Sequence, residues 1–364
     1  MRKIAIYGAG RCGVCAYEIL LMIGCEIYCF LDSSKEKQGT LICGTICRSP
    51  DTIIGNDEFQ IVVALGVEHF NEVKQEIYLR GHKNVVSFSD ALEMILDDRK
   101  FFRPLLELAW KHKDAALYYN LPMSRLDVQG EVKINEKVAV YTSVFGDYDD
   151  VVFQSFESEN LDFYYISDEK PPDNYIGRWI DGTVLIPNSI SNPIYRNRFT
   201  KMHPHLIFPE YKYSIYVDGN IEIFGNVSAF IKQNKTGISA FQHPYRNCIY
   251  WEFLELARMH RVNLEATEML FNKYYDERFP KHYGLFSMNV IAREHRDEAC
   301  IEIMNKWWDE FVYSGTARDQ FSFTHVLWKM GFKNTDIGCI GHDPGDSDVI
   351  TVNKHRFRKS GDRI

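Results

Sequence analysis

The first hundred residues alternate between short apolar segments and longer segments whose apolar positions have helical spacing. Four segments predict strands and two predict helices: strands Lys3–Tyr7, Glu26–Leu31, Ile61–Leu65 and Val85–Phe88, and helices Val14–Ile23 and Val67–Arg80. Strands that alternate with helices in this way are typical of βαβ units. The pattern therefore predicts a small parallel sheet with helices on its faces.

A second strand-rich region follows a polar stretch near residue 130. Asp90–Asn120 has helical character, and Leu126–Glu136 is polar and contains a glycine, which is typical of a linker. Beyond it we predict a second α/β domain. The predicted division is a Rossmann-like domain at residues 1–97, a helical connector and linker at 98–136, the second domain at 137–345 and a basic tail at 346–364.

Three predicted strands of the second region end in acidic or polar residues. Ala139–Ser143 is followed by Asp147, Asp149 and Asp150, Phe163–Ile166 by Ser167-Asp168-Glu169, and Ser214–Val217 by Asp218-Gly219-Asn220. The last triplet fits a tight turn, because all three residue types favour turns. It also fits a cation site, because such a strand end directs two oxygen-bearing side chains to one point. Ligands bind beyond the carboxyl ends of strands in open α/β sheets, so the three ends together favour a site.

A glycine-rich turn follows the first strand. Gly8, Gly10 and Gly13 have GxGxxG spacing, and Asp32 ends the next strand, where a ribose-binding acid is expected. These four residues predict nucleotide binding, and the alternative is an accessory domain that keeps the glycines for strand–helix packing. IAIYGAGRCG, FLDSS and Ala64–Gly66 resemble the small Rossmann-like domain of some sugar O-acyltransferases and bacterial glycosyltransferases.

Charge and hydropathy narrow the classes of function. The 364 residues carry a formal net charge of −8, which argues against a nucleic-acid binder. The chain has no long apolar stretch and starts directly with a strand, so we expect a cytoplasmic protein. Nine cysteines without zinc spacing are expected to be buried thiols. The basic tail is interpreted as a solubilising segment or as a peripheral contact with the inner membrane face; it contains Lys354, Arg356, Arg358, Lys359 and Arg363.

The second region contains the groups that a nucleotide-sugar would need. Its diphosphate must be neutralised by a divalent cation, by basic side chains, or by both. Asp218 and Asn220 would hold Mg²⁺ or Mn²⁺, and a basic run that includes Arg198 and Lys201 precedes their strand. Asp319 opens an amphipathic helix, where the simplest role for its side chain is that of an N-terminal cap.

Several long motifs make this region recognisable. VYTSVFGDYDD, FYYISDE, RNRFTKMHPHLIFPEYKYSIYVDGNIEI, FQHPYRNCIYWE, FPKHYGLFSMNVIAREH and ARDQFSFTHVLWKMG occur in this order between residues 137 and 344. They resemble the glycosyltransferase-like domain of the TOD1/MUCI70 family. That family is related to the family-eight retaining glycosyltransferases of the GT-A fold, so the resemblance implies a GT-A-type α/β domain.

The resemblance implies a role for each matching residue. The nucleotide donor would contact Tyr141, Thr142, Gly146, Asp168, Arg198, Lys201 and Asp218. The metal ligands would be Asp218, Asn220 and His342, although Asn220 replaces an acid and the context of His342 (HDPGDSD) departs from the family-eight pattern. Asp319 and Gln320 would be catalytic, close to the sugar or the acceptor. The acceptor side would include His243, His282 and Gly284.

The resemblance implies a retaining, hexosyltransferase-like glycosyltransferase that uses a divalent cation. Its donor would be a nucleotide-sugar, with a UDP-sugar preferred, and its acceptor a glycan or a lipid-linked glycan in surface-polysaccharide assembly. One alternative is a non-catalytic module that binds nucleotide-sugars or glycans. Another is a metal-dependent hydrolase with Asp218, His243, His282 and His342 as ligands. The residues alone leave these alternatives open.

Overall fold

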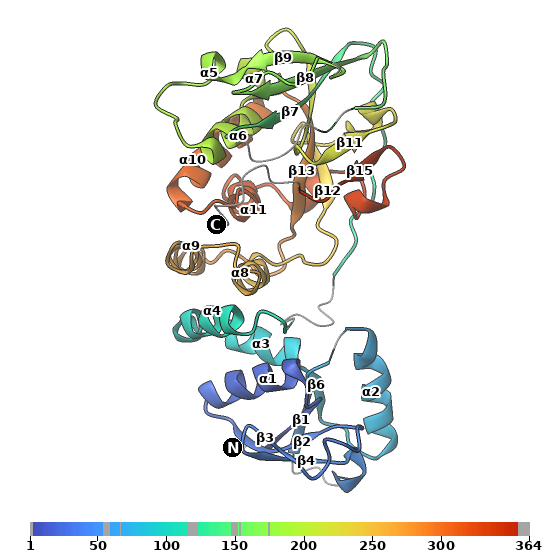
Figure 1. Ribbon diagram of the computed structural model, residues 1–364, viewed down its shortest axis with the longest axis vertical. Coiled ribbons are helices and arrows are strands. Elements are labelled where there is room, and N and C mark those ends of the chain that lie inside the picture. Colours follow the sequence, from blue (N-terminus) through green and yellow to red (C-terminus); the bar gives the residue numbers. More distant parts are fainter. Residues whose placement is uncertain are drawn as a thin grey trace. The chain divides into compact units, whose positions relative to one another are not determined.

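The computed structural model describes residues 3–53, 59–65, 67–115, 123–146, 152, 154–173 and 175–355. The chain forms two compact units (Figure 1). Unit 1 comprises Met1–Pro122 and Tyr250–Arg278, and unit 2 comprises Met123–Ile249 and Phe279–Ile364. Asp147, Asp149 and Asp150 lie outside the described residues, as does the tail from Arg356 onward. None of the described helices is long and apolar enough to cross a membrane.

Unit 1 is built on a six-stranded sheet in the order β3-β4-β2-β1-β5-β6. Neighbouring strands are parallel except β3 and β4, which form a hairpin. The strands are β1 (Lys3–Tyr7), β2 (Glu26–Leu31), β3 (Leu41–Ile42), β4 (Thr45–Arg48), β5 (Phe59–Val63) and β6 (Val85–Ser87). The predicted α/β class and parallel strands are confirmed, whereas the short β3–β4 hairpin was not predicted.

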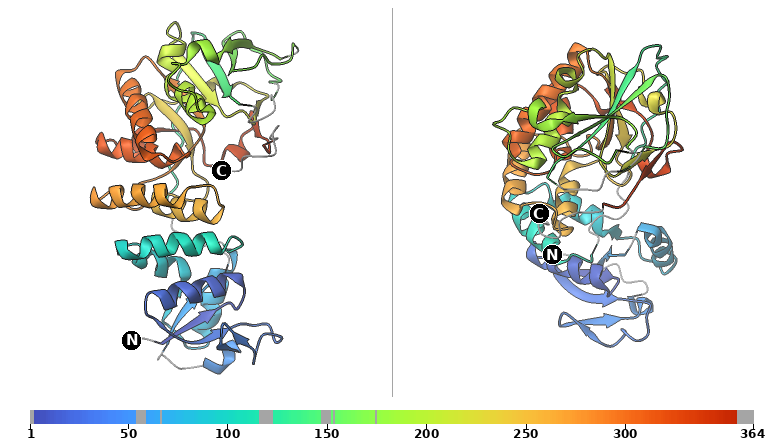
Figure 2. Two further views of the ribbon diagram at one scale, coloured as in Figure 1. Left: turned by 60° about the vertical axis from the view of Figure 1, so that its left-hand side comes forward. Right: turned by 45° about the horizontal axis from the view of Figure 1, so that its top comes forward.

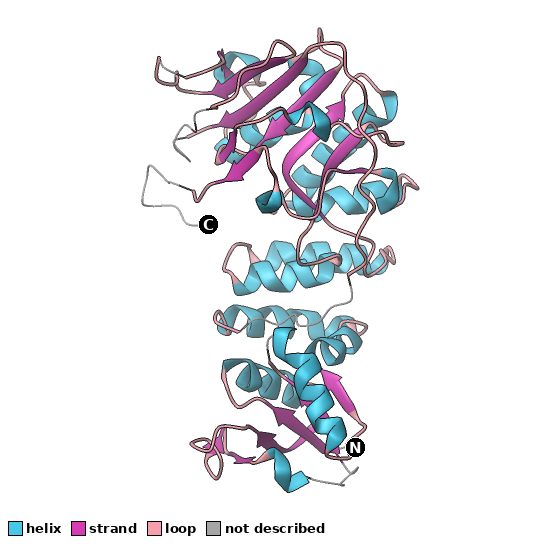
Figure 3. Ribbon diagram, turned by 90° about the vertical axis from the view of Figure 1, so that its right-hand side faces the viewer, coloured by secondary structure: helices cyan, strands magenta, loops and turns pink. Residues whose placement is uncertain are grey.

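Helices accompany the sheet of unit 1 (Figure 3), and they come from two separate parts of the sequence. They are α1 (Arg11–Met22), α2 (Val67–Leu79), α3 (Phe88–Ile95), α4 (Phe102–Lys111), α8 (Ile249–Arg258) and α9 (Leu264–Asp276). The rings of Phe102 and Phe271 stack between α4 and α9, and Arg103 pairs with Glu268 at 3.1 Å. Residues 250–278 therefore belong to unit 1, although the division predicted from the sequence placed them in the second domain.

Unit 2 contains a seven-stranded mixed sheet in the order β14-β12-β13-β10-β7-β8-β9. Only β13 is antiparallel to its neighbours, β12 and β10. The carboxyl ends of the other strands and the start of β13 consequently lie at one edge. The strands are β7 (Val138–Val144), β8 (Leu161–Ser167), β9 (Arg178–Asp181), β10 (Tyr213–Val217), β12 (Ile238–Gln242), β13 (Phe286–Glu294) and β14 (Gly338–Cys339).

Different elements cover the two faces of this sheet. One face packs against helices, with α10 and α11 in orange and red (Figure 2); the helices of unit 2 are α5 (Gly182–Leu185), α6 (Pro193–Met202), α7 (Pro204–Ile207), α10 (Glu298–Ser314) and α11 (Gln320–Lys329). The other face packs against a small antiparallel pair of strands, β11 (Ile221–Ile223) and β15 (Ile350–Val352), which are far apart in the sequence. Burial of both faces fixes the strand ends that carry the predicted site.

Candidate active site

The strand order brings most of the predicted site residues of unit 2 to one edge of the sheet. Gly146 follows β7, Asp168 follows β8 and Asp218 follows β10, and these three strands are parallel neighbours. His243 follows β12, and Gly284 precedes β13 at the same edge. This is the position at which open α/β sheets bind ligands.

Asp218-Gly219-Asn220 forms a tight turn at this edge. The backbone N–H of Ile221 donates to the carbonyl of Asp218 at 3.0 Å, and a Cβ atom at Gly219 would meet Val144 at 2.6 Å. Glycine is therefore required by close packing against β7. The side-chain nitrogen of Asn220 donates to the carbonyl of Asn353 at 2.7 Å, which ties the turn to the chain beyond β15. Asp218 remains one-third exposed.

Helix α6 directs a basic residue to this turn. Asn192 caps the helix by accepting from the backbone N–H of Ile194 at 2.8 Å, and Pro193 occupies the first helical position. The last turn of α6 is buried, so that the side chain of Lys201 is only 2% exposed. A buried ammonium group requires carboxylate partners, because its desolvation is costly.

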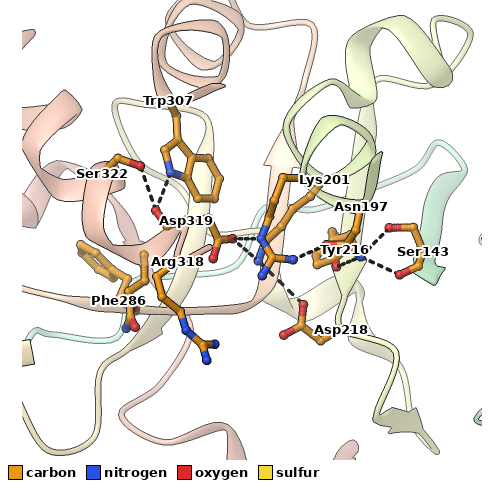
Figure 4. A network of polar contacts seen from close by, with 12 residues as sticks. Ser143, Asn197, Lys201, Tyr216, Asp218, Phe286, Trp307, Arg318, Asp319 and Ser322 are labelled. Carbon is orange, nitrogen blue, oxygen red and sulfur yellow. Dashed lines mark hydrogen bonds and ion pairs between the residues drawn. The ribbon is translucent and has the colours of Figure 1, made fainter. Parts of the chain in front are cut away.

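Lys201 finds these partners in two segments that are far apart in the sequence. Its Nζ atom lies 2.7 Å from Oδ2 of Asp319 and 3.7 Å from Oδ1 of Asp218. Nε of Arg198 lies 3.2 Å from the same Oδ2 atom of Asp319. Figure 4 shows Lys201 with its partners Asp319 and Asp218. Burial raises the pKa of Asp319, but Arg198 and Lys201 outweigh burial and lower it to about 2. Asp319 is thus ionised at neutral pH and belongs to a buried network.

Asp319 does not cap α11 with its side chain. No side-chain capping hydrogen bond forms at this helix start, and the Asp319 carbonyl instead accepts from Trp307 Nε1 at 2.8 Å and from the Ser322 hydroxyl at 3.1 Å. The adjacent Gln320 donates through Nε2 to the carbonyl of Phe286 at 2.9 Å. These contacts fix the start of α11 and turn the carboxylate toward Lys201.

A second buried cation, Arg293, stabilises the carboxyl end of α6. Arg293 of β13 is fully buried, and its guanidinium donates to the Tyr141 hydroxyl at 2.8 Å and to the Lys201 carbonyl. Tyr141 is 1% exposed and donates to the Thr200 carbonyl at 3.0 Å. Cations stabilise the negative carboxyl ends of helices. Tyr141 therefore supports α6 within the core, and no sequence pattern indicated that Arg293 would join it.

The loop after β7 is held by the predicted donor residues themselves. The Gly146 N–H donates to both carboxylate oxygens of Asp168, at 3.2 and 3.0 Å. Gly146 has φ +67°, and an added Cβ would meet Pro193 at 2.9 Å. Nearby, the hydroxyl of Thr142 and Oδ1 of Asn289 are buried without a hydrogen-bond partner among the residues described. Such unpaired oxygens are positions where a ligand or a water molecule would pair.

The predicted acceptor residues organise two loops at the other end of the same edge. Nδ1 of His243 accepts from the backbone N–H groups of Tyr245 and Arg246, at 3.2 and 3.0 Å. His282 Nδ1 lies 2.8 Å from Oδ1 of Asn247, whose carbonyl accepts from the Gly284 N–H. Gly284 has φ +121°, where glycine is favoured. The two histidines thus shape the loops that border this end of the site.

The structure does not bring the predicted metal ligands together. His342 follows β14, which is separated from β10 by two strands, and its Nε2 atom lies 2.8 Å from the Leu126 carbonyl. In the part of the chain that the structure describes, no group of three or more His, Cys, Asp or Glu side chains could hold a metal ion. With Asn220 bonded to Asn353, the donor set does not fit a divalent-cation site. The ligands predicted for a hydrolase, which include Asp218 and His342, likewise form no such group among the described residues.

In unit 1 the carboxylate beside the glycine turn is already bonded to groups of the same chain. Asp32 accepts from the Ala9 N–H and from the Ser34 N–H, both at 2.9 Å, and pairs with Lys37 at 3.0 Å. An added Cβ at Gly13 would lie 1.8 Å from the Gly8 carbonyl oxygen, so this glycine permits close strand–helix packing. Gly10 borders open space. The contacts of Asp32 and Gly13 match the packing alternative, and nucleotide binding here stays a prediction.

With this geometry established, comparison with known proteins assigns the family. The model of the TOD1/MUCI70 glycosyltransferase-like domain matches residues 121–340. The chain belongs to this family. The match covers the sheet of unit 2 and the whole Lys201–Asp319 network. It confirms the resemblance noted in the sequence motifs.

Solved structures of glycosyltransferases show weaker similarity. Apo mouse xyloside xylosyltransferase 1 is 12% identical, with 57% of this chain and 84% of that chain covered and a TM-score of 0.35. The mannosyltransferase Ktr4p from S. cerevisiae is 13% identical, with coverages of 71% and 86% and a TM-score of 0.29. These scores are low, and the family assignment does not depend on them. A comparison with curated proteins gave no match.

Proposed function

We propose that unit 2 transfers a sugar from a nucleotide-sugar to a glycan or a lipid-linked glycan. The observation that carries this proposal is the buried network of Arg198, Lys201, Asp218 and Asp319 at the carboxyl edge of the sheet. A ligand-binding edge that concentrates such charge within a glycosyltransferase-like family suits a substrate with a charged diphosphate and a polar sugar. A UDP-sugar with a hexosyl group is the donor that we would test first.

The proposed donor lies along the ends of β7, β8 and β10. The loop held by Gly146 and Asp168 borders the nucleotide, and the unpaired Thr142 hydroxyl offers it a hydrogen bond. Arg198 is 19% exposed and approaches the diphosphate. The acceptor then enters from the side of His243 and His282, which lie at the β12 and β13 end of the edge.

Asp319 would stabilise charge in this reaction and would not act as a base. A carboxylate with a pKa of about 2 is a weak proton acceptor at neutral pH, because general bases work best with a pKa near the operating pH. In a retaining transfer the leaving phosphate can accept the acceptor proton. The ionised Asp319 then supports the positive charge that develops on the donor sugar, and Gln320 fixes the loop beside it.

Calorimetric titration and a turnover assay test this proposal together. UDP, GDP and a panel of UDP-hexoses are titrated into the wild-type protein, and UDP release from each UDP-hexose is followed with and without glycan acceptors. We expect one UDP site per chain that is lost in Asp218→Ala. Asp173→Ala, which changes a carboxylate that is 95% exposed, is the matched control. Absence of nucleotide binding by the wild-type protein in every condition contradicts the proposal.

A further inference from the structure

The turn predicted to hold a metal ion, Asp218-Gly219-Asn220, already faces a positively charged side chain, that of Lys201. Divalent cations bind best where several carboxylate oxygens converge. Here the first acid, Asp218, faces the Lys201 ammonium at 3.7 Å. The second acid is replaced by Asn220, whose amide nitrogen serves the Asn353 carbonyl. An aspartate at position 220 would direct a carboxylate oxygen toward that carbonyl, so the asparagine fits its surroundings better than an acid would.

Among the described residues, further basic side chains lie close to this turn. Arg198 and Lys201 pair with Asp319, and Lys201 also faces Asp218. The positive charge of Arg318 also helps to lower the pKa of Asp319. Arg293 is fully buried, and its hydrogen bonds within the described residues go to a carbonyl, a hydroxyl and a thioether, none of which carries a formal charge. Arg318 is only partly buried and lies beside Asp319 (Figure 4).

A set of fixed basic side chains suits a nucleoside diphosphate as a leaving group. Preorganised cations stabilise charge as it develops, and they need no reorganisation during the reaction. Buried charges are screened little by solvent, so that even Arg293, which lies behind α6, acts on the site. Exposed Arg198 and Arg318 atoms can touch the diphosphate, whereas Lys201 is almost fully buried and acts by holding Asp218 and Asp319 in place.

We propose that this site binds and releases the nucleoside diphosphate without a divalent cation. The inference rests on the proposed transferase function. In the transfer, the bond between the anomeric carbon and the β-phosphate oxygen breaks, and its electron pair stays on that oxygen. The acceptor oxygen forms the new bond to the anomeric carbon, and its proton passes to the leaving phosphate. Arg198 and Arg318 neutralise the diphosphate that forms, and Lys201 is a positioning residue that takes the place of the metal beside Asp218.

Titration of UDP into metal-stripped protein tests this directly. The full chain is treated with EDTA, dialysed, and titrated with UDP in EDTA or in Mn²⁺. We expect dissociation constants within about twofold of each other, and UDP-hexose turnover that EDTA does not reduce. UDP binding that requires Mn²⁺ overturns this inference but leaves the proposed transferase intact. Absence of binding in both buffers overturns both proposals.

A variant of the positioning residue distinguishes its role from a simple structural one. Lys201→Met removes the ammonium group between Asp218 and Asp319, so that a divalent cation can take its place beside Asp218. We expect UDP affinity in EDTA to fall by about tenfold or more, the range seen when one charged partner is lost, and Mn²⁺ to restore part of it. Arg198→Gln, on a less buried side chain, should weaken UDP binding without creating a response to Mn²⁺. A Lys201→Met protein that binds UDP like the wild type, with or without Mn²⁺, contradicts the role given to Lys201.

Discussion

The two units use the same contact at corresponding places, yet only one of them concentrates charge there. In unit 1, Asp32 after β2 accepts the Ala9 N–H from the turn after β1. In unit 2, Asp168 after β8 accepts the Gly146 N–H from the loop after β7. In each case the two strands are parallel neighbours, so the carboxylate closes the glycine-bearing loop beside it.

The difference lies in what surrounds this contact. The carboxylate of Asp32 is fully engaged by two backbone N–H groups and Lys37. In unit 2 the same edge also carries Lys201 and Asp319, which come from α6 and the start of α11. A glycine turn closed by an acid is therefore a folding feature that either unit can use. The buried charge beside it is what distinguishes a candidate reaction site.

The largest effect is expected when Asp319 is neutralised. Asp319→Asn leaves the Lys201 ammonium buried beside a single, more distant carboxylate, and breaking a buried pair in this way costs about 3–5 kcal/mol. We expect unit 2 to lose stability by this order in denaturant unfolding and to lose UDP-hexose turnover. Asp173→Asn removes the partner of Lys170 in an exposed pair and should change neither. Equal effects of the two substitutions would remove the distinction between buried and exposed charge.

The stability of the wild type and of Asp319→Asn should also respond differently to acid pH. The pKa of Asp319 is lowered from 3.8 to about 2 in the folded protein, so its ion pairs stabilise the folded state fully above about pH 4. This contribution is lost as the pH falls from about 4 toward 2, where the folded-state carboxyl becomes protonated. We expect the acid destabilisation of unit 2 to be shallower in Asp319→Asn than in the wild type. Parallel stability curves down to pH 2 would show that Asp319 does not titrate in this way.

Replacement of each of the two equivalent aspartates, Asp32 and Asp168, by alanine sharpens the comparison between the units. Asp32→Ala removes charge-assisted hydrogen bonds from the glycine turn of unit 1, which costs about 1.5–3 kcal/mol. We expect faster amide exchange in β1 and α1 with unchanged UDP affinity. Asp168→Ala should instead loosen the β7 loop and weaken UDP binding. UDP affinity that falls only in Asp32→Ala would place the nucleotide in unit 1.

The smallest effect is expected at Tyr141. Tyr141→Phe removes the hydroxyl that accepts from Arg293 and donates to the Thr200 carbonyl, a loss of about 0.5–1.5 kcal/mol for each of these two hydrogen bonds. Because the ring keeps its place in the core, UDP should still bind with nearly unchanged affinity. Thermal unfolding and UDP titration check the two expectations. A large loss of UDP affinity with unchanged stability would indicate that Tyr141 contacts the ligand directly.

The sequence was informative wherever the chemistry lies at a strand end. Buried strands that end in polar residues identified Asp218 and Asp168, and the basic run before β10 identified Lys201 and Arg198. Arg293 gave no signal, because its identity and its place near the end of a strand also fit an exposed position. Only the packing of α6 over β13 shows that its guanidinium is buried.

Tertiary structure also decided features that helical periodicity leaves open. The pattern of residues 250–278 shows that helices form, but not that they complete unit 1 through α4. The motif around His342 suggested a metal ligand, whereas the segment 123–130 supplies the Leu126 carbonyl as its partner. In both cases the deciding contact lies more than a hundred residues away, beyond the reach of local patterns.

The most direct test of the account is hydrogen–deuterium exchange of the full chain with and without saturating UDP. If the nucleotide binds to unit 2, residues 141–146, 167–169 and 218–220 of its charged edge become protected. Residues 8–13, the glycine turn of unit 1, then exchange at an unchanged rate. Protection confined to residues 8–13 would contradict the assignment of the nucleotide to unit 2.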